Sequence, residues 1–270
     1  MLVTIRMNHQ WTKGSVKVGK TQFAYHRTGG NLPALLLAHG LTDNGLCWSR
    51  VAKRLEADFD IIMLDTHGHG LSARVDANIV DSQGDDVAAV IKALQLDKPI
   101  IMGHSVGASL MAKVASRHSD LISKVILEDP VFMPKPSEQS LQARINGFQL
   151  QVEKFNSMTL EQIETLGKKL SPNWHQDEFE QWAIAKHQVD AKVLAHYEYL
   201  PWQQTIASIQ VPTLLIHGDT ANGGIISNAV VAEAKTINPT MQSAYVENSG
   251  HNIHRENLDG FIAALNQFLH

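Results

Sequence analysis

The chain has 270 residues, of which 44% are hydrophobic, and its 23 Lys and Arg against 27 Asp and Glu give a formal net charge of -4. This length and apolar content suffice for one large α/β domain with an insertion. Acidic and basic residues are interspersed, so the basic stripe that nucleic-acid binding requires is missing, and we predict no nucleic-acid partner. Neither a signal peptide nor a bilayer-spanning run stands out, so we expect a cytoplasmic protein without a membrane partner.

The first half of the chain alternates between strand-like and helix-like segments. An alternating stretch rich in β-branched and aromatic residues at 16–25 predicts an opening hairpin. Continuous apolar runs predict strands that are buried on both faces, and the segments between them have helical spacing. The expected strands are 34–38, 61–64, 100–102 and 125–127, and the expected helices are 48–55, 85–96 and 105–116. This order predicts a parallel sheet with helices on both faces.

The alternation stops between residues 131 and 204, where the apolar residues keep helical spacing throughout. Groups of them near 141–148, 160–166, 179–183 and 189–197 predict about four short helices. The α/β pattern then resumes, with strands expected at 212–216 and 243–246 and helices at 228–237 and 258–269. We therefore divide the chain into an α/β core, residues 1–130 and 205–270, and an inserted helical cap or lid, residues 131–204.

A Gly-x-Ser-x-Gly sequence, formed by Gly103, Ser105 and Gly107, lies between an expected strand and an expected helix. Small residues on either side of the serine let the chain turn sharply, so that the serine oxygen projects from the carboxyl edge of the sheet. The helix directs its free N–H groups and the positive end of its dipole at the same point. A bare motif of this kind occurs by chance in roughly one chain in ten of this length, so its context decides its meaning.

Four motifs in this order resemble the α/β-hydrolase superfamily over nearly the whole chain. They are His39-Gly40-Leu41, Asp65-x-x-Gly68-x-Gly70-x-Ser72, Gly103-x-Ser105-x-Gly107 and Gly250-His251, each after an expected strand. The resemblance is to the serine esterase or lipase-like branch with a helical cap. It implies an α/β-hydrolase fold, with a mostly parallel central sheet flanked by helices, in which the four motifs meet at one sheet edge.

The same resemblance assigns catalytic roles. It implies that Ser105 is the nucleophile and that His251 is the base that accepts its proton, because an alcohol needs such a base near neutral pH. The acid usually follows the strand expected here at 212–216, which favours Asp219. Asp129, after the strand at 125–127, stays open as the alternative, since some relatives place the acid there.

The oxyanion hole is implied at two backbone N–H groups, those of Leu41 and Val106. Asp65 is expected to anchor its own loop, and His254 is expected to lie at the surface. No cluster of Lys and Arg in the cap stands out as a clamp for a dicarboxylate substrate, and Lys186 and Arg144 stay open for that role.

The sequence contains no clear motif for binding a metal or a cofactor. His67 and His69 lie in a Gly-rich loop that the resembled family uses without a metal, and no carboxylate stands beside them at ligand spacing. A dinucleotide fingerprint and a phosphate-binding Gly-Lys-Ser/Thr loop are both missing. We predict no metal and no cofactor.

The serine at the turn limits the reactions that we expect this protein to catalyse. Haloalkane dehalogenases and epoxide hydrolases of the resembled superfamily attack with an aspartate at this place, so Ser105 argues against both. We expect a carboxylesterase-like enzyme that cleaves carboxylic esters of small to medium acyl or aryl substrates through an acyl-enzyme. Lactone opening and hydrolysis of carbon-carbon bonds in meta-cleavage products are the alternatives. A cofactor-free perhydrolase or haloperoxidase and a non-catalytic ligand receptor are more remote ones.

Overall fold

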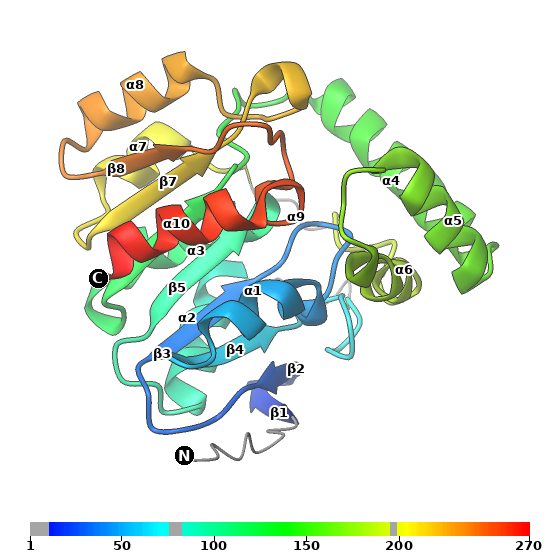
Figure 1. The fold of residues 1–270 in the computed structure, drawn as a ribbon, viewed down its shortest axis with the longest axis horizontal. Helices are drawn as coiled ribbons and strands as arrows, with labels where there is room; N and C mark the ends of the chain where they lie inside the picture. The colour runs from blue at the N-terminus through cyan, green and yellow to red at the C-terminus, as the bar shows by residue number, and fades with distance from the viewer. Residues whose placement is uncertain (1–10, 76–82, 195–198) are drawn as a thin grey trace, which may run out of the picture.

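The computed structural model describes residues 11–75, 83–194 and 199–270. One eight-stranded sheet runs through it in the order β1-β2-β4-β3-β5-β6-β7-β8 (Figure 1). β2 pairs antiparallel with β1 and with β4, and all other neighbouring strands are parallel. The strands are β1 (Thr12–Val18), β2 (Thr21–Arg27), β3 (Ala34–Ala38), β4 (Asp60–Leu64), β5 (Ile100–His104), β6 (Lys124–Glu128), β7 (Thr213–His217) and β8 (Gln242–Tyr245). The predicted, mostly parallel sheet is confirmed.

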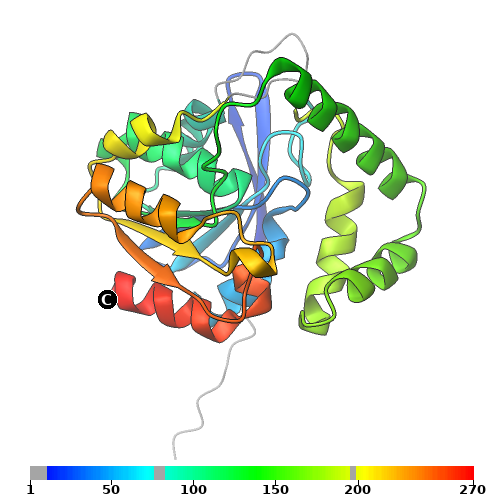
Figure 2. The ribbon, with the colours of Figure 1, turned by 90° about the horizontal axis from the view of Figure 1, so that it is seen from above.

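Helices cover both faces of the sheet, which explains the unbroken apolar runs of the strands. Figure 2 shows α1 (Ser49–Leu55) and α10 (Leu258–Leu269) on one face, with α2 (Gln83–Ala93), α3 (Val106–Arg117), α7 (Trp202–Ala207) and α8 (Asn228–Ile237) on the other. In β3, Leu36 packs toward α2 and α3, whereas Leu35 and Leu37 pack toward α1 and α10. All three are 0% exposed, and burial of each contributes roughly 2 kcal/mol.

The inserted helices stand beside the sheet, near the carboxyl ends of its parallel strands (Figures 1 and 2). They are α4 (Glu138–Asn156), α5 (Leu160–Leu170) and α6 (Phe179–His187). Thr159 begins α5 with a capping box that it forms with Gln162. Phe155, Ile163 and Trp182 bury their side chains in a small core of their own. We continue to propose residues 131–204 as a cap. Near its two ends, the rings of Phe132 and Trp202 stack with their centroids 5.2 Å apart and pack in the main core.

The prediction of a fourth cap helix at 189–197 is wrong for those of its residues that the structure describes. Residues 191–194 form turns, and α7 begins only at Trp202. The cause is the side chain of Asp190, whose two oxygens accept from the backbone N–H groups of Lys192 and Val75 at 2.9 and 3.0 Å. Such local side-chain bonds compete with helix formation. Residues 195–198, and with them Tyr197, lie outside the described residues.

Short helical segments complete the chain between these elements. They are the 3₁₀ segments Gly45–Trp48, Ser119–Leu121, Gln176–Glu178 and Thr220–Asn222, and the one-turn helix α9 (Ile253–Glu256). Within the described residues, no helix combines the length and the apolar character that a bilayer crossing requires.

Candidate active site

Ser105 lies at the turn between β5 and α3, and its backbone is strained, with φ of 57° and ψ of -118°. The turn requires glycine on both sides. A Cβ at Gly103 would lie 2.3 Å from the carbonyl oxygen of Gly107, and a Cβ at Gly107 would lie 2.4 Å from that of His39. Both distances are impossible for real atoms, so the two glycines permit the strained conformation that points the Ser105 side chain into the site.

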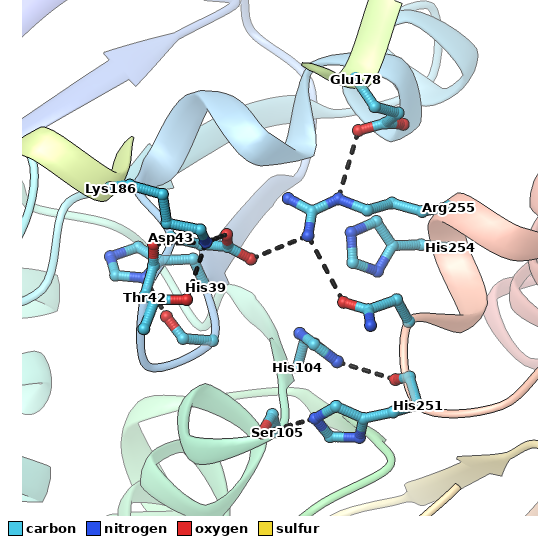
Figure 3. Close-up of polar contacts among 12 residues, drawn as sticks. His39, Thr42, Asp43, His104, Ser105, Glu178, Lys186, His251, His254 and Arg255 are labelled. Carbon is cyan, nitrogen blue, oxygen red and sulfur yellow. Dashed lines mark hydrogen bonds and ion pairs between the residues drawn. The ribbon is translucent and has the colours of Figure 1, made fainter. Parts of the chain in front are cut away.

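His251 follows β8 and lies beside Ser105 (Figure 3). Its Nε2 atom is 3.0 Å from Ser105 Oγ, although the two residues are 146 positions apart. The Nε2–H group of His104, next to the serine, donates to the carbonyl oxygen of His251 at 2.8 Å and so fixes the backbone of the histidine loop. The structure thus brings together the two residues that the resemblance paired as nucleophile and base.

Among the described residues, the carboxylate that accepts from His251 Nδ1 is that of Asp129, at 2.6 Å. Asp129 directly follows β6 and is completely buried. Its Oδ2 and Oδ1 atoms also accept from the backbone N–H groups of Ile225 and Ile226, at 2.8 and 2.9 Å. These two donors come from the loop after β7, so that loop orients the carboxylate toward the imidazole without providing the carboxylate itself.

Our preference for Asp219 as the acid does not fit this geometry. Its side chain turns back and accepts from the backbone N–H of Ala221 at 2.8 Å, where it caps a 3₁₀ segment. The second choice from the sequence, Asp129, occupies the place beside the imidazole. Asp129 was the open alternative because it follows an expected buried strand, but the usual position of the acid in the family favoured Asp219.

Leu41 and Val106, whose backbone N–H groups are the two implied oxyanion donors, line one cavity together. Val106 is the first residue of α3, where backbone N–H groups have no partner within the helix. The loop of Leu41 is fixed by two buried histidines. His39 Nδ1 donates to the Gly40 carbonyl oxygen at 2.8 Å, and His69 Nε2 donates to that of Leu41 at 2.5 Å. Burial lowers the pKa of His39 to about 4 and that of His69 to about 3, so both rings are neutral near pH 7.

The cavity lined by Leu41 and Val106 has a volume of about 110 Å³. An apolar cavity of about 150 Å³ accommodates a benzene ring, so this one has room for a small acyl group. Most of its lining is apolar and comes from both the core and the inserted segment. The apolar lining residues include Leu41, Leu64, Leu110, Val131, Val193 and Leu200, and the polar ones include His67 and Lys113.

His254 was expected at the surface, and this expectation is wrong. The residue is 2% exposed, and its Nδ1–H donates to the carboxylate of Glu128 at 2.9 Å. Burial lowers the pKa of His254 to about 3 and raises that of Glu128 to about 7. No local sequence pattern indicated this pair, because the two residues are 126 positions apart and only the fold brings them together.

The other polar residues singled out in the sequence have structural partners or lie at the surface. Asp65 accepts from the backbone N–H groups of Gly45 and Leu71 at 2.7 and 2.8 Å, so it anchors its loop as expected. Arg144 is exposed on α4. Lys186 is 3% exposed and bonds to the loop after β3, so it does not face a substrate as a clamp.

Comparison with known proteins identifies the class to which this fold and site belong. Residues 33–258 match the family described as alpha/beta hydrolase fold, and the chain therefore belongs to that family. The chain is 29% identical to the N-formylmaleamate deformylase of Pseudomonas putida, over 95% of this chain and 96% of that protein. It is 24% identical to the 2-(acetamidomethylene)succinate hydrolase of Mesorhizobium japonicum, over 90% of each protein.

A solved structure gives the same result for the fold. The crystal structure of E-2-(acetamidomethylene)succinate hydrolase matches with a TM-score of 0.81 and 20% sequence identity, over 96% of this chain and 99% of that one. At this identity the likeness concerns the fold alone.

Proposed function

We propose that this protein is a serine hydrolase that cleaves small acyl compounds through an acyl-enzyme on Ser105. The observation that supports this most is one continuous chain of hydrogen bonds. Ser105 Oγ lies 3.0 Å from His251 Nε2, and His251 Nδ1 lies 2.6 Å from Asp129 Oδ2. In this arrangement an alcohol has a base within reach, and the base has a carboxylate that orients it.

The proposed reaction begins when His251 Nε2 accepts the proton of Ser105 and the serine oxygen attacks the substrate carbonyl. The carbonyl oxygen becomes an oxyanion, which the N–H groups of Leu41 and Val106 stabilise. His251 then donates the proton to the leaving group as the carbon-heteroatom bond breaks. A water molecule hydrolyses the acyl-enzyme in the same way, and Asp129 stabilises the imidazolium in both steps.

We propose that the bond cleaved is the carbon-nitrogen bond between an acyl group and the nitrogen that carries it. The two relatives that match nearly the whole chain are named for acting on N-formylmaleamate and on 2-(acetamidomethylene)succinate, and both names denote N-acyl compounds with a one- or two-carbon acyl group. The small cavity beside Val106 is consistent with such acyl groups. A nitrogen leaving group must be protonated as it departs, and in the proposed reaction His251 supplies the proton that it accepted from Ser105.

Carboxylic esters, which the sequence led us to expect, are the second candidate. The apolar lining of the cavity favours them, and the attack on an ester carbonyl uses the same groups. Lactones and carbon-carbon ring-fission products are alternatives on the same site.

A substrate panel tests the proposal. It contains an N-formyl and an N-acetyl derivative of a small unsaturated acid, p-nitrophenyl acetate and butyrate, a simple lactone and a ring-fission dienoate, each assayed with wild type and with Ser105→Ala. We expect turnover to be fastest for an N-acyl compound and to be lost in the variant. Faster turnover of the esters would favour the second candidate. If wild type turned over nothing and a fluorophosphonate failed to label Ser105, the proposed function would be wrong.

A further inference from the structure

The loop that contains Leu41 and the segment that follows His251 meet at one buried carboxylate, that of Asp43 (Figure 3). Asp43 is 6% exposed and lies two residues after Leu41. Its Oδ1 accepts from Lys186 Nζ at 3.2 Å, and its Oδ2 accepts from Arg255 Nη1 at 3.0 Å. Lys186 belongs to α6 of the inserted helices, whereas Arg255 lies on α9, four residues after His251. The carboxylate therefore joins three segments that are distant in sequence.

Lys186 binds the loop at three points. Besides Asp43, its Nζ atom donates to the carbonyl oxygen of Thr42 at 2.9 Å and to the Thr42 hydroxyl oxygen at 2.7 Å. An ammonium group has three protons to donate, so the loop accepts all of them. The ammonium also lies 4.5 Å from the ring centroid of Trp182, one turn earlier on the same helix.

The loop is a tight turn whose orientation determines where the Leu41 N–H points. The backbone N–H of Asp43 donates to the Gly40 carbonyl oxygen at 3.1 Å, which closes the turn. The Gly40 carbonyl and the Leu41 N–H belong to the same planar peptide unit and point in opposite directions. A rotation of the turn would therefore change the direction of the N–H that we propose as an oxyanion donor. Lys186 contacts the far end of this turn, at Thr42 and Asp43.

Arg255 connects the same carboxylate to the histidine loop. Its Nη1 also lies 3.4 Å from Asn252 Oδ1, in the residue that follows His251. Its Nε donates at 3.3 Å to Glu178, which precedes α6. The inserted segment thus contacts both sides of the site, through Lys186 at the oxyanion loop and through Glu178 at Arg255 of α9.

The charges in this network depend on one another. Burial alone would raise the pKa of Asp43, but Arg255 and Lys186 lower it well below its usual range. Burial lowers the pKa of Lys186, and the neighbouring Asp43 opposes this. Ions taken out of water require such partners, so the carboxylate and the ammonium fix each other in place.

We propose, on the basis of the proposed function, that Lys186 is a positioning residue for catalysis: it orients the turn at residues 40–43 so that the Leu41 N–H points at the oxyanion. The inserted helices are then part of the catalytic machinery as well as a cover for the cavity. Lys186 acts through the loop, and its loss affects the transition state more than the binding of substrate.

Three variants test this role: Lys186→Met, Lys186→Arg and the matched control Lys169→Met, which changes an exposed lysine on α5. For each we measure kcat and KM per active site, counted by titration with a fluorophosphonate, on the panel compound that wild type cleaves fastest. A misfolded fraction lowers the number of titrated sites but leaves kcat per site unchanged. Loss of a whole oxyanion donor lowers kcat by about 100- to 1,000-fold, so a misoriented donor should lower it by about 10- to 100-fold.

We expect Lys186→Met to lower kcat per site by at least about 10-fold with KM within about 3-fold of wild type. Lys186→Arg should recover most of the loss, and Lys169→Met should behave like wild type. Unchanged kcat per site in Lys186→Met would overturn the proposal. If Lys186→Met does not fold, Thr42→Val decides, because it removes one acceptor of Lys186 and keeps every charge. A several-fold lower kcat per site supports the role, and wild-type kcat overturns it. Wild type without turnover or labelling would instead refute the proposed function itself.

Discussion

The Nδ1 atom of His251 lies 2.6 Å from Oδ2 of Asp129, a residue 122 positions earlier in the chain. The two groups meet because Asp129 directly follows β6 and His251 lies in the loop after β8, and β6, β7 and β8 run parallel. Two backbone N–H groups from the loop after β7 keep the carboxylate in this orientation. The geometry therefore favours Asp129 as the acid of the proposed hydrolase.

Asparagine substitutions compare the two acid candidates directly. In Asp129→Asn, the amide cannot maintain the correct tautomer of His251, so kcat should fall by about 1,000- to 10,000-fold. Asp219→Asn is the matched control, because Asp219 caps its own turn, and its kcat should stay within about 3-fold of wild type. Initial rates on the best substrate, with circular dichroism to verify folding, measure both. A large loss in Asp219→Asn alone would contradict the assignment.

Alanine substitutions at glycines test the close packing of the serine turn. In Gly107→Ala, the new Cβ would lie 2.4 Å from a backbone oxygen, so we expect a loss of several kcal/mol in the free energy of unfolding. Gly147→Ala on α4 is the control, since a Cβ there meets no heavy atom of the described residues within 4 Å. It should stabilise the protein by about 0.5 to 1 kcal/mol. Urea unfolding measures both, and equal effects in the two variants would show that the turn tolerates a side chain.

Buried histidines make stability depend on pH. Burial lowers the pKa of His39 to about 4 and those of His69, His104 and His254 to about 3, from 6.5. Between about pH 3 and 6.5 the unfolded chain binds more protons than the folded chain, so the free energy of unfolding falls as the pH falls. Burial raises the pKa of Glu128 from 4.5 to about 7, so between those two pH values this carboxyl makes the free energy of unfolding rise as the pH falls. Four histidines outweigh one carboxyl.

Urea unfolding at about pH 5 and about pH 7.5 measures this dependence. Each buried histidine contributes roughly 1 kcal/mol per pH unit in this range, so the protein should be less stable at the lower pH by several kcal/mol. Equal or greater stability at about pH 5 would mean that these rings are protonated in the folded protein.

The size of the cavity should limit the acyl group. Val131 lines the cavity, and Val131→Phe fills part of it, so kcat/KM should fall at least about 10-fold for p-nitrophenyl butyrate and much less for the acetate. Leu160→Phe, at an exposed position on α5, serves as the control for the added ring. An equal loss for both esters in Val131→Phe would show that the acyl group binds elsewhere.

The sequence predicted those parts of the fold that local pattern determines. The strand around Leu36 was predictable because a strand buried on both faces is apolar at every position, and Ser105 was predictable because the turn needs its two glycines. Polar residues that act on distant segments were not predictable in this way. Asp190 ends a helical pattern through side-chain bonds, and Lys186 is 143 positions from the carboxylate that it neutralises. No periodicity in a sequence indicates such pairs.

The most direct test of the proposed function is the mass of the intact protein, measured within seconds of mixing with the panel compound that wild type cleaves fastest. We expect a transient increase equal to the mass of the acyl group less the one hydrogen that it replaces, located by peptide mapping at Ser105 and accumulating in wild type but not in Ser105→Ala. Turnover that continues in Ser105→Ala, or an acyl group found on a different residue, would contradict the assignment of Ser105 as the nucleophile.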